Sequence, residues 1–505
     1  MSQSKSPDFL LILDIDGLRQ DVFHQALASG RAPNLAGLLG GPDAHFGVHL
    51  NPVSPAPSIT FCAQSTIFTG EPPARHGIVG NQFFDRAGSR SQGVPRFYAF
   101  DIGDALAVED AVQTFTGKVG LLGETISQNV TTLYEQAAAA GLTSAVVYHM
   151  VSRGAGEWMR PSLVDIARFT KGGNLFGIRA EQYDREMMDK TLNLLRREPA
   201  PQVLTVYFMG LDHESHHSGP GVQFDYLTRV VDVQIGRLAA VLQARRLLAN
   251  CLVLMVSDHG QIQVIPDDRH SLRLSFPFDR EMGVLFDALG LDVHDVPGEG
   301  PNCNALVASN GGMAHVYLQH RQGVWRDAPR FNEDVLPVAR AFWEAHLTGR
   351  YAPDLQGALA MVLVRDVQRD GWNSTYQALT PAGERLPVAD FLTANPRIQT
   401  VDAVPRLNDL AGPNSGDVLL VSNYAGGYYF GGATTGVHGG LHPEDSLAVG
   451  SFCWPGASPD QLAHLRDLAT GTADDRRRAA GRQYASLSDL LPVMDGIIRP
   501  AQPRV

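Results

Sequence analysis

Three short apolar segments each lead into residues of types that bind metal ions. The segments are residues 9–13, 203–208 and 252–256. Apolar segments of this length without polar alternation are typical of central strands in a parallel sheet, which are buried on both faces. Open sheets of this kind bind ligands beyond the carboxyl ends of their strands. We therefore predict an α/β fold in which the polar residues after these strands share one site.

The residues that follow the segments are carboxylates and histidines. They are Asp14 and Asp16 after the first segment, Asp212 and His216 after the second, and Asp258 and His259 after the third. Asp14 has a second interpretation as a helix cap, because Asp is common where a strand leads into a helix. Any one pair has such an alternative, but the repetition of an apolar strand followed by Asp or His favours a shared metal site.

The second cluster also contains a zinc-protease pattern, His213-Glu214-x-x-His217. That motif requires a helix, so that its two histidines share a face. Here the segment leaves a predicted strand and soon meets Gly219-Pro-Gly, which leaves little room for a helix. We therefore expect Asp212 and His216 to face one metal from a loop or a single turn. A metalloprotease remains an alternative.

Residues 60–69 are predicted to form a helix that begins near Thr60 and ends at Gly70. The amino end of a helix offers free N–H groups and a positive dipole end to an anion. A hydroxyl placed there can attack a phosphoryl group, although threonine requires activation by a base or a metal.

Asn81 could donate to a phosphoryl oxygen or could be a simple turn residue. Arg153, just after a predicted strand, could reach the same sheet edge or be a solvated loop residue.

Composition narrows the class of partner. The 505 residues carry a net charge of −12, which argues against a broad surface for nucleic-acid polymers or anionic membranes. A small anionic substrate stays possible, because bound metal ions dominate a local field. The four cysteines are scattered, which fits a reduced compartment. Residues 9–13 are too few to span a membrane and end in acids, so we expect a cytoplasmic protein.

The alternation of strands and helices breaks after residue 261. A hairpin is predicted around Asn310-Gly-Gly, between strands at 304–309 and 313–319, and a helix at 331–348. We predict a core of residues 1–261 with 431–505, and an inserted capping region at 262–430. Within the core we expect a surface loop at 86–121 and one helix over 122–141.

Taken in order, these motifs resemble the alkaline phosphatase superfamily. They are Asp16-Gly17, Thr60 with Thr69-Gly70, His76-Gly77-Ile78 with Asn81, Asp212 with His216, Ser257-Asp258-His259-Gly260, and His438-Gly439. The resemblance is to the branch of nucleotide pyrophosphatases/phosphodiesterases and phosphonoacetate hydrolases. It implies a three-layer α/β sandwich around a mostly parallel sheet, with an inserted capping region.

The same resemblance implies a site with two divalent metal ions, zinc by expectation and manganese or iron as alternatives. Asp212, His216 and His438 would bind the first ion, and Asp16, Thr60, Asp258 and His259 the second. Thr60 would be the nucleophile and form a phosphothreonine intermediate. Asn81 would contact the phosphoryl oxygens, and Phe61 would stack on or border the leaving group.

Departures from related families narrow the substrate. Dehalogenase-type phosphatases have Thr where this chain has Leu18, and sulfatases have Cys or Ser at the position of Thr60. Some monoesterases carry Lys-x-Arg where this chain reads Val151-Ser-Arg153. A dianionic monoester needs more positive charge than a diester does. We therefore predict a phosphodiesterase or nucleotide pyrophosphatase for small phosphate esters. A phosphomonoesterase or phosphonoacetate-type hydrolase is the alternative. A non-catalytic binding protein on the same scaffold is another.

Overall fold

The computed structural model describes residues 6–100, 108–162, 179–274 and 281–498. Its first sheet has the strand order β2-β21-β8-β1-β7-β5-β6. The five strands from β8 to β6 run parallel, and β21 and β2 join antiparallel at one edge. The bounds are β1 Phe9–Ile15, β2 Gly47–His49, β5 Ser144–Val147, β6 Glu157–Met159, β7 Val203–Phe208, β8 Cys251–Val256 and β21 Gly450–Cys453. The mostly parallel sheet predicted from the apolar segments is confirmed.

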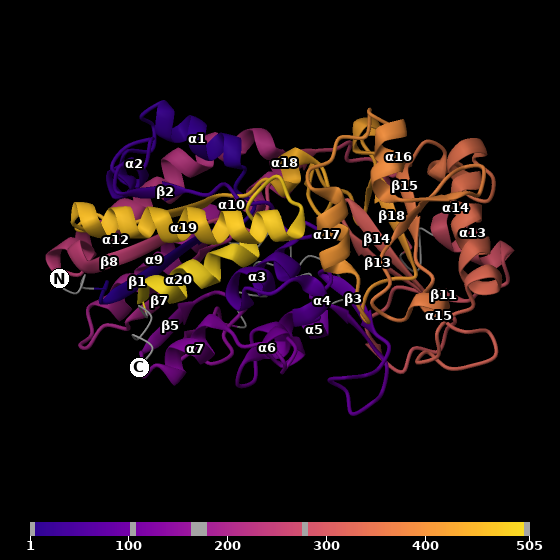
Figure 1. Ribbon diagram of the computed structural model, residues 1–505, viewed down its shortest axis with the longest axis horizontal. Helices are drawn as coiled ribbons and strands as arrows, with labels where there is room; N and C mark the ends of the chain where they lie inside the picture. The colour runs from indigo at the N-terminus through magenta and orange to yellow at the C-terminus, as the bar shows by residue number, and fades with distance from the viewer. Residues whose placement is uncertain (1–5, 101–107, 163–178, 275–280, 499–505) are drawn as a thin grey trace.

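Helices cover both faces of this sheet and make three layers (Figure 1). All seven residues of β1 are buried. Leu10 and Ile12 belong to the hydrophobic cluster that includes residues of α3 (Thr60–Thr69), α7 (Leu133–Ala139) and α20 (Leu490–Ile498). Leu11 and Leu13 belong to the opposite cluster, with α1 (Gln20–Ala28), α9 (Ala180–Leu195) and α12 (Asp232–Ala244). Alternate side chains of β1 thus point to opposite faces of the sheet and pack against different helical layers.

A second sheet of seven strands comes from residues 293–422, inside the segment predicted as an insertion. Its strands in spatial order are β11 Val293–His294, β13 Ala305–Asn310, β14 Met313–Leu318, β18 Val418–Ser422, β15 Leu359–Val364, β16 Gln377–Leu379 and β17 Arg385–Leu386. The predicted hairpin of β13 and β14 and the helix α14 (Leu336–Thr348) are confirmed. The cluster around Leu10 continues into this sheet through residues such as Val307 and Leu363, so both sheets share a core. The boundaries at 262 and 430 stay a prediction.

Two local predictions were wrong. The expected helix over 122–141 is two helices, α6 (Gly120–Thr125) and α7, because Thr132 and Glu135 form a capping box that starts α7. The expected surface loop at 86–121 contains β4 (Arg96–Ala99), paired with β3 (Gln82–Asp85), and α5 (Val108–Thr114). Phe97, Tyr98 and Phe100 are buried, and this aromatic group was hidden by the polar composition around it. Residues 101–107 of that segment lie outside the described residues.

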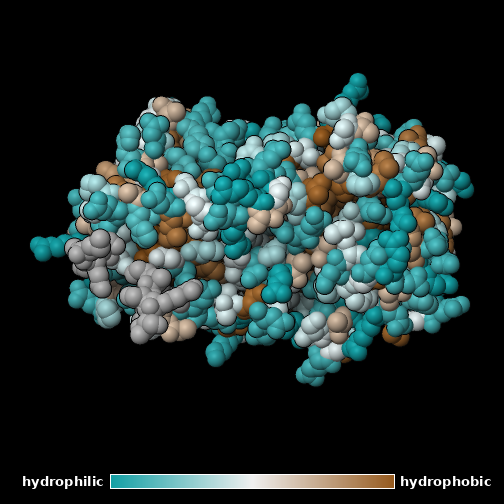
Figure 2. Space-filling model, in the orientation of Figure 1, coloured by the Kyte–Doolittle hydropathy of each residue, from teal (hydrophilic) through white to brown (hydrophobic). Residues whose placement is uncertain are grey.

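The remaining elements connect or cover the two sheets. They are α2 Pro33–Leu39, α4 Pro73–His76, α10 Gly210–Ser218, α11 Gln223–Tyr226, α13 Glu281–Ala288, α15 Val367–Asp370, α16 Val388–Ala394, α17 Ala403–Leu410, α18 Pro443–Ser446 and α19 Pro459–Ala480, with the short strands β9 Ile262–Gln263, β10 Ser271–Leu272, β12 Gly298–Glu299, β19 Tyr429–Phe430 and β20 Gly436–Val437. Among the described helices, none is both long and apolar enough to cross a membrane. Figure 2 shows hydrophilic residues over most of the face seen in Figure 1, in keeping with the charge of the chain.

Candidate active site

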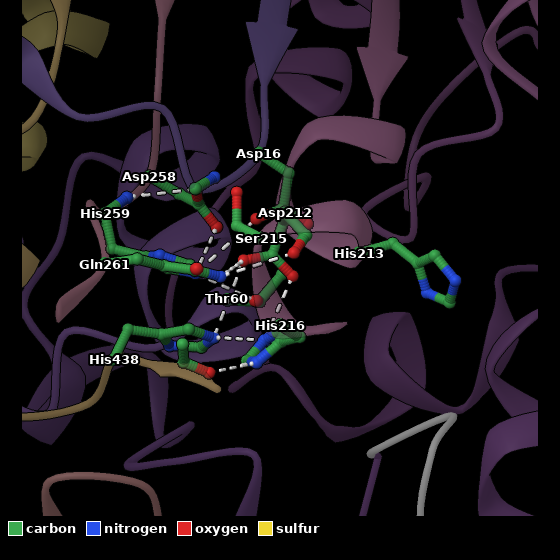
Figure 3. Close-up of polar contacts among 12 residues, drawn as sticks. Asp16, Thr60, Asp212, His213, Ser215, His216, Asp258, His259, Gln261 and His438 are labelled. Carbon is green, nitrogen blue, oxygen red and sulfur yellow. Dashed lines mark hydrogen bonds and ion pairs between the residues drawn. The ribbon is translucent and has the colours of Figure 1, made fainter. Parts of the chain in front are cut away.

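Thr60 is the first residue of α3, as the sequence predicts. The preceding residue, Ile59, is extended, and Gly70 ends the helix in a left-handed conformation with φ of 66°. Thr60 is 8% exposed, and its Oγ1 lies 3.1 Å from Nε2 of His259. The hydroxyl is therefore placed at the amino end of a helix and directly beside a histidine of another strand end (Figure 3).

One group of metal-binding side chains surrounds this hydroxyl. Asp16 follows β1 and Asp258 follows β8, which are neighbours in the sheet. Nε2 of His259 lies 3.5 Å from Oδ1 of Asp16 and 3.4 Å from Oδ2 of Asp258. Asp16, Asp258 and His259 each offer one ligand atom, and these atoms lie within 4.8 Å of one another. The shared site predicted at the strand ends is thus assembled from residues about 240 positions apart.

A second group lies next to the first. Nε2 of His216 is 3.2 Å from Oδ2 of Asp212 and 3.2 Å from Nε2 of His438. His438 comes from the glycine-rich segment after β20, and its Nε2 lies 3.8 Å from Oδ1 of Asp212. The imidazole rings of His259 and His438 stack with centroids 3.7 Å apart, which places the two groups side by side. Asp212, His259 and His438 also converge as a ligand group.

Asp212 and His216 reach this group from a helix, so the expectation of little room for a helix was wrong. α10 spans Gly210–Ser218, about two and a half turns, and the glycines follow its end. Asp212 and His216, four residues apart, share one face of it. His213 points away from the site in Figure 3, and its ring packs on that of His217 at 4.5 Å. The helix that the protease motif requires is therefore present, but in the described part of the chain neither His213 nor His217 belongs to a group of three metal-binding side chains.

The histidine hydrogen bonds define which nitrogen faces the centre. Nδ1 lies 2.7 Å from Gly436 O in His216, 3.2 Å from Ser58 O in His438, and 2.9 Å from Gly260 O in His259. A carbonyl oxygen can only accept, so each Nδ1 carries the proton and each Nε2 of a neutral ring presents a lone pair. Burial, followed by the neighbouring His259, holds the pKa of His438 well below its usual value, which keeps that ring neutral. This is the arrangement of metal-binding histidines whose ring is oriented by a backbone acceptor.

The carboxylates are in an environment that requires positive charge. Burial, and then the charge of Asp258, raise the pKa of Asp16 well above its usual value. Burial raises the pKa of Asp258 to about 6, against the opposing effect of His259. Burial also acts to raise the pKa of Asp212, and only positive charge on the neighbouring imidazoles, that of His216 first, lowers it; with neutral rings, a bound cation would have to supply that charge. Among the described residues, Oδ1 of Asp16 and Oδ2 of Asp258 receive no hydrogen bond. Cations at this position would stabilise the ionised carboxylates.

The spacing of the ligand atoms fits metal ions. Zinc–ligand bonds of about 2.0–2.1 Å in tetrahedral geometry separate the ligand atoms by roughly 3.3 Å. The separations given above run from 3.1 Å, between Thr60 and His259, to 3.8 Å, between Asp212 and His438, and the ligand atoms of each converging group lie within 4.8 Å of one another. The donor set of imidazole nitrogen, carboxylate oxygen and one hydroxyl is therefore suited to two divalent cations.

Asn81 and Phe61 lie beside the nucleophile. Oδ1 of Asn81 accepts a hydrogen bond of 3.0 Å from the N–H of Phe61, the residue after Thr60. The donor that Asn81 can bring to a substrate is consequently its Nδ2 group. Phe61 is 4% exposed, and its ring stacks on Phe100 with centroids 5.1 Å apart. Phe61 thus forms part of a buried aromatic cluster, and its contact with a leaving group stays a prediction.

Sequence comparison places the chain in a family of known proteins. Residues 10–407 match the model of a family described as type I phosphodiesterase / nucleotide pyrophosphatase. The chain belongs to this family. It is 27% identical over 255 residues to an uncharacterized pyrophosphatase/phosphodiesterase of Schizosaccharomyces pombe, an alignment covering 50% of this chain and 44% of the relative. The chain thus covers less than half of that relative's length.

Solved structures of mouse ectonucleotide pyrophosphatase / phosphodiesterase 5 share the fold. One has a TM-score of 0.52 at 14% identity and covers 88% of each chain. An inactive variant of the same protein in complex with AMP has a TM-score of 0.56 at 13% identity, covering 99% of this chain and 97% of that one. At these identities the likeness supports the α/β architecture of the family, with its large and mostly parallel central sheet.

Arg153 does not join the site, contrary to the prediction from its place after a strand. Its guanidinium donates to the carbonyl oxygens of Ile126, Ser127 and Val130 and pairs with Glu135 at 3.1 Å. The side chain is 7% exposed. Arg153 therefore links the segment between α6 and α7 to the first turn of α7. Its positive charge is paired with Glu135.

Sequence reasoning missed three residues that contact the predicted ligands or Asn81. The hydroxyl of Tyr207 donates to Oδ2 of Asp16, and Nε2 of Gln261 donates to Oδ1 of Asp212 at 2.5 Å. Asn310 binds the backbone of Asn81 from the second sheet. Tyr207 and Gln261 lie within five residues of predicted ligands, a proximity that could have drawn attention to them. Asn310 carries no such signal, because it belongs to a predicted hairpin 229 residues from Asn81.

Proposed function

We propose that this chain hydrolyses phosphodiester or pyrophosphate bonds in small molecules, with nucleotides as the favoured substrate class and Thr60 as the nucleophile. The observation that carries the proposal is the meeting of neutral imidazole Nε2 atoms and three carboxylates beside a hydroxyl at a helix amino end. Membership of the type I phosphodiesterase / nucleotide pyrophosphatase family supports the reaction class. The AMP complex of the mouse protein supports a nucleotide.

Two divalent cations complete the proposed site, and zinc suits the donor set best, with manganese or iron as alternatives. Asp212, His216 and His438 would bind one of them, and Asp16, Thr60, Asp258 and His259 the other. Bound as a pair, the cations would favour ionisation of the Thr60 hydroxyl and neutralise charge on the attacking and leaving oxygens.

The residues of the chain perform the rest of the reaction. Thr60 loses its Oγ1 proton to water and attacks phosphorus, so that the Oγ1–P bond forms as the bond to the leaving oxygen breaks. Asn81 donates from Nδ2 to a non-bridging phosphoryl oxygen as negative charge builds there. Phe61 borders the leaving group. Water then hydrolyses the phosphothreonine ester and restores the Thr60 hydroxyl.

The place of Arg153 supports a diester over a monoester. A terminal dianionic phosphate has more charge to balance than the monoanion of a diester or of an internal pyrophosphate linkage. Arg153 was the candidate for that extra positive charge, and it is engaged with Glu135 and three carbonyls. Phosphomonoester or phosphonoacetate hydrolysis is the second candidate, because the same ligands and nucleophile would serve it.

Two broader proposals accompany the site. We propose that residues 262–430 form a capping region that shapes the leaving-group pocket, in support of which the second sheet lies within that segment. We also propose a cytoplasmic location. The four cysteines are all free, and three are buried, as fits a reducing compartment.

A comparison of substrates tests the proposal. The zinc-loaded protein should cleave bis-p-nitrophenyl phosphate and a nucleotide pyrophosphate faster than p-nitrophenyl phosphate or phosphonoacetate. Chelation should abolish this activity, and so should Thr60→Ala. Neither the wild type nor the variant should cleave casein, the substrate that tests the metalloprotease alternative. An ester of phosphothreonine at position 60 that keeps the p-nitrophenyl or nucleoside group of the substrate, trapped by rapid acid quench and found by mass spectrometry, would identify the nucleophile directly. Failure to cleave all four substrates at full metal occupancy would favour the non-catalytic interpretation.

A further inference from the structure

The turn between β13 and β14 lies between two segments of the candidate site. Asn310 ends β13, and Gly311 and Gly312 lead into β14. One side of the turn contacts residues 80–82, and the other contacts residues 438–440. We propose that Asn310 is a positioning residue, which holds Asn81 in place for contact with the phosphoryl group. This inference rests on the proposed function. It gives a residue of the second sheet a positioning role in catalysis.

The side-chain amide of Asn310 makes four hydrogen bonds to backbone groups. Oδ1 accepts from the N–H of Asn81 at 2.7 Å and from the N–H of Gln82 at 3.1 Å. Nδ2 donates to the carbonyls of Gln82 at 3.0 Å and Ala308 at 3.3 Å. Exchanging the oxygen and nitrogen would set donors against donors, so these partners fix the orientation of the amide. The fully buried Asn310 therefore holds the two N–H groups that flank the Asn81 side chain.

This contact continues to the nucleophile. Asn81 accepts through Oδ1 from the N–H of Phe61, in the first turn of α3, next to Thr60. A side-chain contact from the second sheet thus reaches the helix end that carries the nucleophile through one intermediate residue. A displacement of about 1 Å in a group that contacts the transition state can lower the rate by roughly 10²-fold, so the position of Asn81 matters for turnover.

The other side of the turn is fixed to the segment that carries His438. The N–H of Gly312 donates to the carbonyl of His438 at 2.9 Å. A Cβ at Gly311, where φ is +64°, would lie 1.9 Å from the same carbonyl, and a Cβ at Gly439 would lie 1.9 Å from the carbonyl of Asn310. Glycines at both positions allow this close approach of two backbones. These contacts fix the turn against the segment that carries His438. From this position the Asn310 side chain can hydrogen-bond the backbone of Asn81.

Three single variants test this proposal on the full chain loaded with metal. Asn310→Ala should lower kcat on bis-p-nitrophenyl phosphate by about 10- to 100-fold, with little change in KM or in metal content. Asn310→Asp keeps an oxygen that can accept from both N–H groups, and its second oxygen, when protonated, can donate to the carbonyls of Gln82 and Ala308, so this variant should recover part of that loss. The control is Asn304→Ala, the residue immediately before β13, whose Oδ1 accepts from the N–H of Asp292 at 2.8 Å. It removes a similar contact from the same hairpin and should leave kcat unchanged.

The double variant Asn81→Ala/Asn310→Ala separates positioning from general damage. If Asn310 acts through Asn81, the double variant should be no slower than Asn81→Ala alone. Multiplied losses, or no loss in Asn310→Ala, would overturn the proposal.

Hydrogen–deuterium exchange provides a readout that does not depend on activity. The Asn81 and Gln82 amides should exchange faster in Asn310→Ala than in the wild type or in Asn304→Ala. An inactive wild-type enzyme with this exchange difference would refute the proposed function alone. Unchanged exchange at these two amides would refute the contact itself.

Discussion

The Nε2 atoms of His216 and His438 lie 3.2 Å apart, although the Nδ1 atom of each ring already faces a backbone carbonyl. In neutral rings both Nε2 atoms then present lone pairs, which repel each other unless a cation lies between them. The carboxylate of Asp212, 3.2 Å from His216, supplies the negative charge that such a cation needs. This pair of histidines is therefore the part of the site that depends most directly on metal.

Replacing His438 should empty a metal position. His438→Ala removes one ligand of the group and should bind one equivalent less of zinc, with loss of phosphodiesterase turnover. Zinc per chain is measured by inductively coupled plasma mass spectrometry and compared with rates on the same sample. His442→Ala is the matched control, since His442 lies four residues on, binds Gln399 at 2.9 Å and caps α18. Two zinc ions and wild-type rates in His438→Ala would refute the two-metal site.

Replacing Asn81 should slow the chemical step. Asn81→Ala removes the Nδ2 donor, and loss of one such donor lowers kcat by roughly 10²–10³-fold. KM should change less than kcat, because the contact strengthens as charge builds on the phosphoryl oxygens. The measurement is steady-state kinetics on bis-p-nitrophenyl phosphate. Asn414→Ala serves as the control, because its amide binds the nearby carbonyl of Gly77 at 2.8 Å but contributes nothing to the proposed site. An unchanged kcat in Asn81→Ala would remove Asn81 from the mechanism.

The sequence was most informative where function depends on strand ends. Asp16 and Asp258 follow neighbouring parallel strands, so their meeting could be predicted without knowing any side-chain contact. His438 was different, because only the family resemblance pointed to it. Its glycine-rich segment has no periodicity that would place it.

The errors have physical causes of two kinds. Local signals were misread where two helices or a short strand lay within a mixed segment, as at the capping box of Thr132 and Glu135. Long-range partners were out of reach, since nothing near Arg153 shows that Glu135 and the carbonyls before it would take up its charge. Asn310 is the clearest example, because its amide acts on residues 228 and 229 positions away.

Replacing Arg153 should affect stability more than turnover. Arg153→Met leaves the carbonyls of Ile126 and Val130 without their donor, and loss of such buried bonds costs on the order of 1–3 kcal/mol. Chemical denaturation should therefore show a lower free energy of unfolding. The rate per folded molecule on a diester should stay close to that of the wild type. A variant that is as stable as the wild type but inactive would return Arg153 to the substrate site.

A last prediction concerns the acid that supports α10. Asp184, fully buried on α9, accepts from the N–H of Gly210 at 3.2 Å and from the hydroxyl of Tyr226 at 2.9 Å. Burial raises the pKa of Asp184 from 3.8 to about 7, although these hydrogen bonds oppose the shift. Between these two values the folded chain holds a proton that the unfolded chain has lost. The contribution of Asp184 to the free energy of unfolding should then fall as pH rises from about 4 to about 7.

Asp184→Asn removes this dependence, because the amide stays neutral at every pH and still offers an oxygen to Gly210. Chemical denaturation of both proteins across this pH range should give a difference that grows in favour of the variant up to about pH 7 and then levels off. Below pH 4, where Asp184 is protonated in both states, the difference should lose its pH dependence. A difference that stays constant from pH 4 to pH 7 would show that Asp184 is already ionised in the folded chain, and that the N–H groups at the start of α10 stabilise its charge more than burial opposes it.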